Sequence, residues 1–406
     1  MSVNTDLSHP DNIAEPHPFY EWMRRERPVF WSDALKGWVI TRYDDVYRVI
    51  RDPKFSVEKM APFMAHMKSD GIARKVAELT RVLQDWAVFR DPPAHARLRR
   101  PMNSAFQRDR IEALRPFVHA TVDRLIDVVA DRGEMDMVWD FAYPLPAMVI
   151  THMMGLPETD IDTLKNWSDN LAAFVLSARA TPDKYDRSHA AVMEMRDYFR
   201  AAVEDHRKSP RPDGLTDLIS YGSGSDDALT DEEIVSTAIL MLFAGHETTT
   251  SLITNGMYVL IKNPDQMSRL IDDPNLVPGA IEEFLRFESP AQMLVRVASE
   301  DCTIADQAIA KGDRIFASVL GANRDETKFE RSNGLDVTRA KNQHLAFGHG
   351  MHLCVGAPLA RLEGEIAFRR LLERLTDFEL EQEAPDWSDL LVTRVIKALP
   401  VRFRTR

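Results

Sequence analysis

The segment from Thr230 to Asn263 constrains the fold of this chain more than any other part of the sequence. It opens with the spacing of a capping box, in which the Thr230 hydroxyl can satisfy an early amide while Glu233 reaches back. No obvious helix stop follows before Pro264, and at about 1.5 Å per residue such a helix is roughly 50 Å long. Its first half is apolar on nearly every side, so we expect it to be buried inside a large domain.

The middle of this apolar helix is polar. Residues 244–250 place an acid, a histidine and three hydroxyls among apolar neighbours, and burying such groups without partners costs free energy. Gly245 adds about 1 kcal/mol of destabilisation in a helix interior, which is tolerable where another group must come close. Two readings stay open. The side chains bond back to carbonyls and merely bend the helix, or the helix opens beside a flat ligand where an acid and an alcohol relay protons.

A cysteine framed by glycines lies near the end of the chain. Three glycines within the nine residues 348–356 allow a tightly turned backbone that can approach a planar cofactor closely. Pro358 suits the first turn of a helix, which places Cys354 just before a helix N-terminus. The amides and the positive dipole end there favour a thiolate. A lone cysteine is more often an inert buried residue, but the glycine frame and the helix start argue for a reactive one here.

Charge and cysteine content exclude several classes of protein. The 406-residue chain has a net charge of -12, which argues against a nucleic-acid or membrane partner. Its two cysteines, Cys302 and Cys354, are too few for a disulfide framework, a zinc ribbon or an iron–sulfur cluster held only by cysteine. The first residues lack the apolar stretch of a signal peptide, and the longest uncharged apolar run, 234–244, is shorter than the ~20 residues of a membrane span. We therefore expect a cytoplasmic protein.

Helical periodicity dominates the chain, so the predicted fold class is mostly α with a small β portion. Residues 1–15 are predicted to form a loose N-terminal arm. The helices predicted outside the central one cover 17–26, 44–51, 111–131, 150–176, 190–207 and 360–375. The predicted strands cover 29–31, 38–41, 293–297, 314–319, 392–396 and 399–403.

The run Phe-Gly-x-Gly-x-His-x-Cys-x-Gly from Phe347 to Gly356 resembles the haem-binding loop of the soluble bacterial cytochromes P450. The resemblance spans nearly the whole chain and implies a cytochrome P450 fold, with haem b between the long central distal helix and the proximal cysteine loop and helix. It further implies one haem domain over residues 1–406 with no fused reductase or ferredoxin domain. Cys354 is then the axial ligand of the haem iron, and Cys302 is a structural residue.

The polar centre of the long helix, Ala244-Gly245-x-Glu247-Thr248, resembles the family's oxygen-activation motif. By that resemblance Thr248 is the hydroxyl that hydrogen-bonds dioxygen, and Glu247 is part of the proton supply. The segment 91–99 resembles the one that holds the haem propionates, and a spacing of four puts two of its basic residues on one helix face, though a solvated basic helix start would look the same. The resemblance assigns cofactor contacts to His95, Arg99, Ala244, Gly245, Arg296, Phe347, Gly348, His352 and Gly356.

Two further positions carry the resemblance. Glu283 and Arg286 share a helix face and look like the family's buried ion pair, although a spacing of three is also common in weak surface pairs worth ~0.2–0.5 kcal/mol.

The sequence also departs from the family's pattern. Glu326 stands where the family usually has a proline. Glu247 is the longer of the two acids tolerated in the distal motif, which puts the detailed geometry of a proton relay in doubt.

By analogy with the family, nine mostly apolar residues are candidates for the wall of a substrate pocket, and each could equally be core packing. A small hydrophobic organic substrate is therefore expected, oxidised with O₂ by hydroxylation, epoxidation or O-dealkylation. The nine candidates are Val82, Trp86, Val88, Phe174, Leu240, Phe243, Leu294, Val295 and Thr393.

The chain has no thiols left for a ferredoxin cluster, so the resemblance implies electrons from a separate ferredoxin and its NAD(P)H-dependent reductase. Arg97, Arg100 and Arg361 are candidates for a small basic docking patch. Two alternatives stay open beside the monooxygenase: a peroxygenase-type relative that uses H₂O₂, and a non-catalytic haem-binding sensor.

Overall fold

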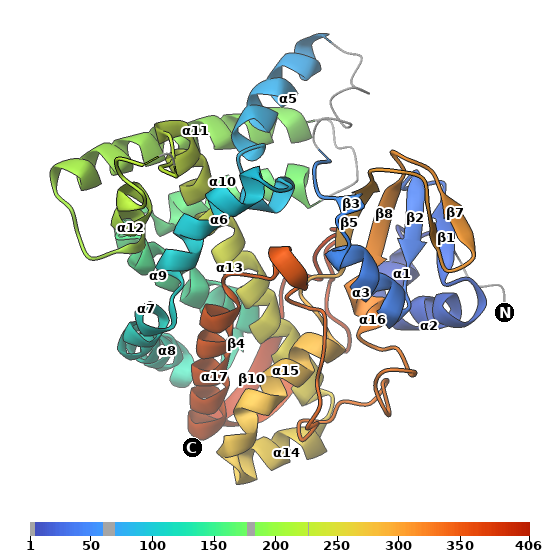
Figure 1. Ribbon diagram of the computed structural model, residues 1–406. Coiled ribbons are helices and arrows are strands. Elements are labelled where there is room, and N and C mark those ends of the chain that lie inside the picture. Colours follow the sequence, from blue (N-terminus) through green and yellow to red (C-terminus); the bar gives the residue numbers. More distant parts are fainter. Residues whose placement is uncertain (1–4, 60–69, 177–182, 226) are drawn as a thin grey trace. The chain divides into compact units, whose positions relative to one another are not determined.

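The computed structural model describes residues 5–59, 70–176, 183–225 and 227–406 (Figure 1). It separates into two compact units, each built from distant parts of the chain. The first unit comprises residues 1–55, 116–145 and 248–406, and the second comprises residues 56–115 and 146–247. The prediction of one domain over residues 1–406 stays a prediction.

The long central helix, α13 (Asp231–Ile261), belongs to both units, because the division between them falls between Glu247 and Thr248. Its capping box is present. The Thr230 amide donates to the Glu233 carboxylate at 2.9 Å, and the Glu233 amide donates to the Thr230 hydroxyl at 3.3 Å. Every residue from 234 to 243 is buried, as the all-round apolar pattern predicts. Among the described residues, no helix is both long and apolar enough to span a bilayer.

The first unit contains a mixed five-stranded sheet in the order β1-β2-β8-β5-β3. The pairs β1–β2 and β5–β8 are antiparallel, whereas β2 and β8 run parallel. Its strands are β1 (Val29–Ser32), β2 (Gly37–Ile40), β8 (Arg314–Ser318), β5 (Met293–Ala298) and β3 (Phe55–Ser56).

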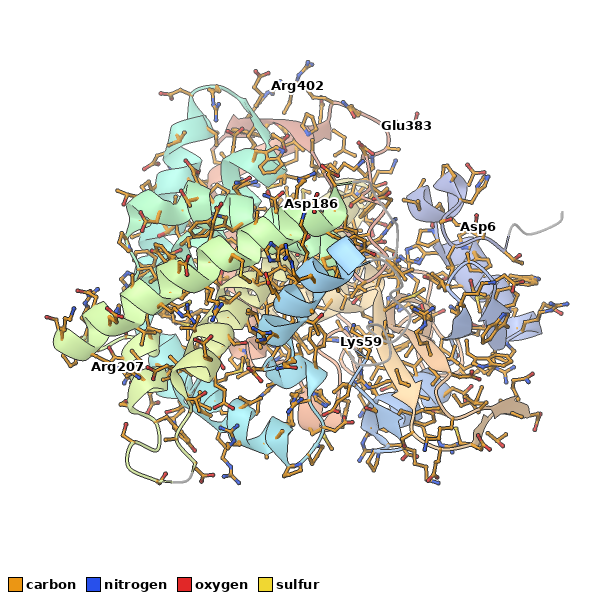
Figure 2. The ribbon with its side chains drawn as sticks, turned by 90° about the horizontal axis from the view of Figure 1, so that it is seen from above. Asp6, Lys59, Asp186, Arg207, Glu383 and Arg402 are labelled. Carbon is orange, nitrogen blue, oxygen red and sulfur yellow. The ribbon has the colours of Figure 1, made fainter. Side chains whose placement is uncertain are left out.

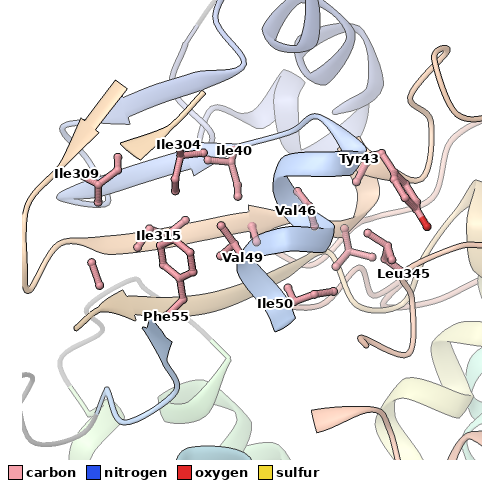
Figure 3. Packing of buried hydrophobic residues seen from close by; sticks show 14 of the residues in the cluster. Ile40, Tyr43, Val46, Val49, Ile50, Phe55, Ile304, Ile309, Ile315 and Leu345 are labelled. Carbon is pink, nitrogen blue, oxygen red and sulfur yellow. The ribbon is translucent and has the colours of Figure 1, made fainter. Parts of the chain in front are cut away.

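Helix α3 (Tyr43–Arg51) covers one face of this sheet (Figure 3). Val46, Val49 and Ile50 from the helix pack against Ile40 and Ile315 from the strands. Spacings of three and four on the helix meet alternating residues on the strands, so both periods bury one face. A second cluster joins residues of helix α2 (His17–Glu26) to the same sheet.

The remaining elements of the first unit are two small sheets and several helices. One sheet has the order β4-β10-β9 and the other pairs β6 with β7. These strands are β4 (Glu134–Asp136), β10 (Pro400–Thr405), β9 (Leu375–Leu380), β6 (Cys302–Ile304) and β7 (Gln307–Ile309). The helices are α1 (Pro10–Ala14), α2 (His17–Glu26), α8 (Arg115–Ala130), a π-helix (Met137–Ala142), α14 (Pro264–Asp272), α15 (Val277–Phe287), α16 (Val319–Ala322) and α17 (Ala357–Arg374).

The second unit is mainly helical in its described residues. Its longest helix, α11, packs against α10 and is crossed by α5, as the upper part of Figure 1 shows. The helices are α5 (Asp70–Leu83), α6 (Ala94–Ala105), α7 (Arg108–Ala113), α9 (Pro144–Met153), α10 (Ile161–Val175), α11 (Lys184–Lys208) and α12 (Gly214–Ser220).

The mostly α fold class with a small β portion is confirmed, but three local predictions are wrong. The predicted helix 150–176 is two helices, because α9 ends at Met153, Gly155 turns the chain with a φ of 69°, and α10 begins only at Ile161. The other two errors lie near the ends of the chain. Residues 10–14 of the expected loose arm form helix α1, and Arg394 donates to the carbonyl oxygens of Ile13 and Ala14. The predicted strand 392–396 makes only isolated bridges, Ala291 with Thr393 and Trp387 with Ile396. In both places contacts distant in sequence decide the conformation, and local propensity carries no signal of them.

Candidate functional site

The cysteine loop has the tight backbone that its glycines predicted. Gly348 and Gly350 have φ angles of 70° and 73°, in the left-handed region where glycine avoids the strain of a side chain. The amide of Cys354 donates to the carbonyl oxygen of Phe347 at 2.9 Å, which closes the loop on itself. Helix α17 begins at Ala357, three residues after the cysteine, with Pro358 in its first turn. Cys354 is therefore held at the positive end of an 18-residue helix.

The thiol of Cys354 is exposed, and a fixed positive charge lies near it. The Arg361 guanidinium stacks 4.6 Å from the Phe347 ring centroid and donates two hydrogen bonds to Glu282, at 2.7 and 2.8 Å. The bond to Glu282, and then attraction to Cys354, raises the pKa of Arg361. The helix dipole and Arg361 both favour the thiolate form, which is the form that binds a metal.

Arg296 and His352 lie in the same unit as the cysteine loop. Leu294 lies beside Gly348, since a side chain on that glycine would come within 3.9 Å of the Leu294 Cδ1 atom. Arg296 follows two residues along β5 and therefore points to the same face of the strand as Leu294. His352 ends a short 3₁₀ turn (Gly350–His352) within the loop. The first unit thus groups Cys354 with the predicted cofactor contacts Phe347, Gly348, Gly356, His352 and Arg296.

The polar centre of α13 interrupts the burial of the helix. Ala244 and Thr248 are exposed, one turn apart, and Glu247 keeps some accessible surface, although residues 234–243 before them and 249–250 after them are buried. His246 points elsewhere, because it is buried with its Nδ1 atom 2.9 Å from the carbonyl oxygen of Leu242. The contact between His246 and the Leu242 carbonyl agrees with the first reading, and the flat ligand and proton relay of the second stay a prediction. One side bonds back to the helix, and the side with Ala244 and Thr248 is open.

Gly245 has a packing reason that the sequence did not indicate. A Cβ atom there would lie 2.8 Å from the Ile150 side chain, so a larger residue would require that side chain to shift. The group that approaches Gly245 is therefore a helix of the same unit. Its assignment as a cofactor contact stays a prediction.

The carboxyl group of Glu247 has a raised pKa, which favours its protonated form. Burial, followed by repulsion from Asp169 on α10, raises its pKa from an ordinary value of 4.5 to about 7. Because the folded pKa lies above the unfolded one, the protonated acid stabilises the fold below pH 4.5, and this stabilisation is lost as the pH rises through about 7. A carboxyl group with this pKa can give and regain a proton near neutral pH.

We expect the coupling of electron use to product formation to fall as the pH rises through about 7, where Glu247 loses its proton. Replacing Asp169 with asparagine removes one of the charges that raise this pKa, so the midpoint should move to lower pH. The measurement is the ratio of product formed to reductant consumed across pH. Asp162→Asn, an exposed acid on the same helix, is the control. A midpoint that stays in place in the Asp169 variant would contradict the assignment.

His95 and Arg99, the predicted propionate contacts, lie together in the second unit on the first two turns of α6. His95 is only 5% exposed, and burial, followed by the charge of Arg99, lowers its pKa. Arg99 donates from Nε to the Asn103 side chain at 2.9 Å. A buried imidazole beside a guanidinium gains from an anion, so the pair suits a carboxylate ligand.

The predicted ion pair of α15 is present and completely buried. Glu283 and Arg286 are both 0% exposed, and two hydrogen bonds of 2.7 and 2.8 Å join them. Glu283 also accepts from Arg339, Asn342 and the Asp336 amide. The remaining donors of Arg286 reach the carbonyl oxygens of residues 323, 332 and 334. One ion pair therefore anchors the long connection that leads from α16 to the cysteine loop.

The nine candidate pocket residues fall into the two units. Trp86 and Phe243 pack with ring centroids 5.3 Å apart in the second unit. In the first unit, Thr393 is held next to β5, because the Gln292 amide donates to the Val392 carbonyl at 2.7 Å and the Arg394 amide donates to Pro290 at 2.8 Å. The second-unit set is Val82, Trp86, Val88, Phe174, Leu240 and Phe243, and the first-unit set is Leu294, Val295 and Thr393. Their role as a pocket wall stays a prediction.

The three arginines considered for a docking patch are each paired with a carboxylate. Arg97 donates to Glu233 at 2.9 Å, and Arg100 lies 3.1 Å from Asp227. Arg361 is held by Glu282, as described above. The carboxylate partners compensate the positive charge of all three arginines. The three residues therefore no longer support a basic docking patch.

Two interactions of these residues were not predicted from the sequence. Asp169 tunes Glu247 from another helix, and nothing in the local sequence marks that pairing. Glu326, the departure from the family's proline, accepts from Arg24 at 3.2 Å and from Arg25 at 3.0 Å. The two adjacent basic residues on α2 were the available signal for an acidic partner there.

These features fit a haem group. An exposed cysteine at a helix N-terminus can supply a thiolate, the small Ala244 leaves one side of a buried helix open, and His95 with Arg99 suits an anionic edge. The structure groups the candidates in two sets, one in each unit. That both sets contact one cofactor stays a prediction.

Comparison with known proteins agrees with this reading. The family model described as Cytochrome P450 matches residues 63–396. The biotin biosynthesis cytochrome P450 of Bacillus subtilis is 34% identical over 405 residues, covering 99% of this chain and all of that protein. Among solved structures, P450BioI with an acyl carrier protein ligated to hexadec-9Z-enoic acid has a TM-score of 0.90 at 34% identity over 97% of this chain and 100% of that one. Bacillus megaterium CYP109E1 in complex with testosterone has a TM-score of 0.86 at 31% identity over 97% and 98%.

Proposed function

The chain belongs to the cytochrome P450 family and is an oxidoreductase of the monooxygenase type, and from this premise we propose that it inserts one oxygen atom from O₂ into a small hydrophobic organic substrate. Hydroxylation, epoxidation and O-dealkylation are the reactions that such an insertion produces. The observation that carries the proposal is the position of Cys354, exposed at the start of α17 with Arg361 nearby. This is the environment that a thiolate ligand of haem iron requires.

Haem b would be held by Cys354 as the axial ligand, with the basic side chains of His95, Arg99, Arg296 and His352 toward its propionates. When bound, the group supplies the redox chemistry that activates dioxygen, with a thiolate that favours O–O cleavage. The remaining work belongs to this chain. It must exclude water from the substrate, orient the substrate and deliver protons.

Proton delivery is assigned to neighbouring residues of α13. Thr248 is an exposed residue of this helix, and its hydroxyl would donate a hydrogen bond to dioxygen. Glu247 carries a proton near neutral pH and can replace the one that leaves. A positioned proton donor typically contributes ~10²–10⁴ in rate.

Replacing Thr248 with alanine should leave haem binding and substrate binding unchanged but send most of the electrons into peroxide. We expect the yield of product per electron to fall at least about tenfold, since one positioned donor is lost. The measurement compares reductant consumed, product formed and peroxide released. Thr248→Ser, which keeps the hydroxyl, should retain most of the coupling, and normal coupling in the alanine variant would overturn the assignment.

The substrate class is proposed from the candidate pocket and the relatives. The nine candidate pocket residues are mostly apolar, and apolar contacts discriminate only ~1–3 kcal/mol per methylene, so they favour a hydrophobic molecule without naming it. Relatives have been solved with a fatty acid on a carrier protein and with a steroid. A panel of such compounds, read by the spin-state change in haem absorption, identifies the class this chain prefers.

Electrons are proposed to come from a ferredoxin and its NAD(P)H-dependent reductase. The cysteine loop is proposed as a docking site, because Met351 and Leu353, which precede Cys354, are 42% and 48% exposed and would offer apolar contacts to a partner. The reconstituted system with labelled dioxygen tests the whole proposal. One labelled oxygen atom should appear in the product, and efficient turnover with peroxide alone would instead indicate a peroxygenase.

A further inference from the structure

The second unit contains a cavity of about 310 Å³ under helix α5, with both polar and apolar residues in its lining. Two ion pairs fasten α5 across α11, Lys75 with Asp186 at 2.6 Å and Glu78 with His189 at 2.6 Å. Asp186 is labelled in Figure 2, where α5 is seen crossing that helix. The cavity is lined by residues from α5, from the turn after it, from α11 and from the start of α13, including Arg81, Val82, Asp85, Arg196, Glu232 and Ser236.

Two charged residues of this cavity, Arg81 and Asp85, form no ion pair with a residue that the structure describes, and Asp85 is the more buried of the two. Glu232 is bonded to Arg196 at 3.1 Å and also pairs with Arg200. Asp85 is partly buried, and among the residues that the structure describes its carboxylate accepts no hydrogen bond and lies in no ion pair. Leaving a carboxylate partly desolvated without a partner is unfavourable, so Asp85 is the group from which a ligand would gain most.

The electrostatic surroundings of Asp85 indicate the sign of that ligand. Burial, and then repulsion from Glu233 and Glu232, raises its pKa, against the attraction of Arg90 and Arg97. A cation beside Asp85 would offset both the desolvation of its carboxylate and the repulsion from the two glutamates. Arg81 carries the opposite charge into the cavity, but it is exposed to water and lies near Glu78, so it has less to gain from an anion.

Asp85 also lies between polar and apolar surroundings. The next residue, Trp86, is 1% exposed and packs against the rings of Phe89 and Phe243. Val82 lines the cavity, and its carbonyl oxygen accepts from the Ser236 hydroxyl at 2.6 Å, which fixes the end of α5 to α13. Val82, Trp86 and Phe243 are among the residues proposed to line the substrate pocket.

We propose that this cavity binds the cationic amine end of an amphiphilic organic substrate, with Asp85 as the counter-ion and the hydrocarbon part directed toward Val82 and Trp86. The proposal rests on the proposed function for the apolar part of the site and adds the charge of the substrate. It would make Asp85 a specificity-determining residue.

The test is calorimetric titration of the holoenzyme with dodecyltrimethylammonium and with dodecanol. The first probe carries a permanent positive charge and has no lone pair to ligate iron. Wild type should bind the cation about tenfold or more tightly than the alcohol, and Asp85→Asn should lose this preference while dodecanol binds as before. Asp197→Asn, an exposed acid on α11 outside the cavity lining, should change neither affinity.

Equal affinity of wild type for the two probes, or a parallel loss of both in Asp85→Asn, would overturn the amine site. The result is separable from the proposed function, because calorimetry does not depend on the haem chemistry. If the reduced protein lacked the spectrum of a thiolate-ligated haem while the cation preference persisted, the proposed function would fail and the amine site would stand.

Discussion

Replacing Glu283 with alanine is expected to destabilise the fold by about 3–5 kcal/mol, because the change leaves Arg286 charged and buried without its partner. The loss extends beyond the pair. Arg339, Asn342 and the Asp336 amide all donate to the same carboxylate. The connection between α16 and the cysteine loop should loosen, so haem retention should fall together with stability. Denaturant unfolding and haem content measure the two effects.

Glu365→Ala is the matched control, since it is also a helical glutamate paired with an arginine, Arg369 at 3.1 Å, but on the surface. Partly exposed pairs of this kind contribute about 0.2–1 kcal/mol, so this variant should unfold almost like wild type. A loss below about 1 kcal/mol in Glu283→Ala would show that the buried network does not anchor this region.

Replacing Cys354 with serine is expected to lower oxygenation of substrate by at least about a thousandfold. Enzymes supply rate enhancements of 10⁶ or more, and here the thiolate ligand is the component on which activation of dioxygen depends. The measurement is product formed per reductant consumed in the reconstituted system. The protein itself should stay folded, because the side chain of Cys354 is exposed and serine has nearly the same size.

Cys302→Ser is the control for the thiol chemistry. Cys302 lies in β6, pairs with Ile309 across the two-stranded sheet and packs against the apolar cluster of Figure 3. Burial raises the pKa of this thiol, so it stays protonated and unreactive. Activity in this variant should match wild type, and comparable activity in the two serine variants would contradict the role given to Cys354.

Much of the fold could be predicted because its strongest elements carry local signals. The α13 helix begins at its capping box and ends before Asn263 and Pro264, and α2 covers the predicted range 17–26. Two of the misjudged segments, 10–14 and 392–396, are held by Arg394, which joins the start of the chain to its end. Local propensity carries no information on contacts that distant in sequence.

For the site, the short motifs predicted which residues are candidates for ligation and catalysis. They did not predict the neighbouring side chains that change the pKa or the charge around those residues. The glycine-framed loop predicted where Cys354 lies, and the turn geometry agrees. The charge of Arg361 near the thiol, the repulsion of Glu247 by Asp169 and the pairing of Glu326 with α2 all come from side chains brought together by packing. Which side chains form such pairs depends on packing in three dimensions, and the sequence at most suggests the type of partner, as the adjacent basic residues of α2 do for Glu326.

The spectrum of the reduced holoprotein under carbon monoxide tests whether Cys354 ligates the haem iron. Wild type should show the red-shifted main band of a thiolate-ligated haem, and Cys354→Ala should lose it. A wild-type band at the position of a histidine-ligated haem, or the same spectrum in both proteins, would contradict ligation by Cys354.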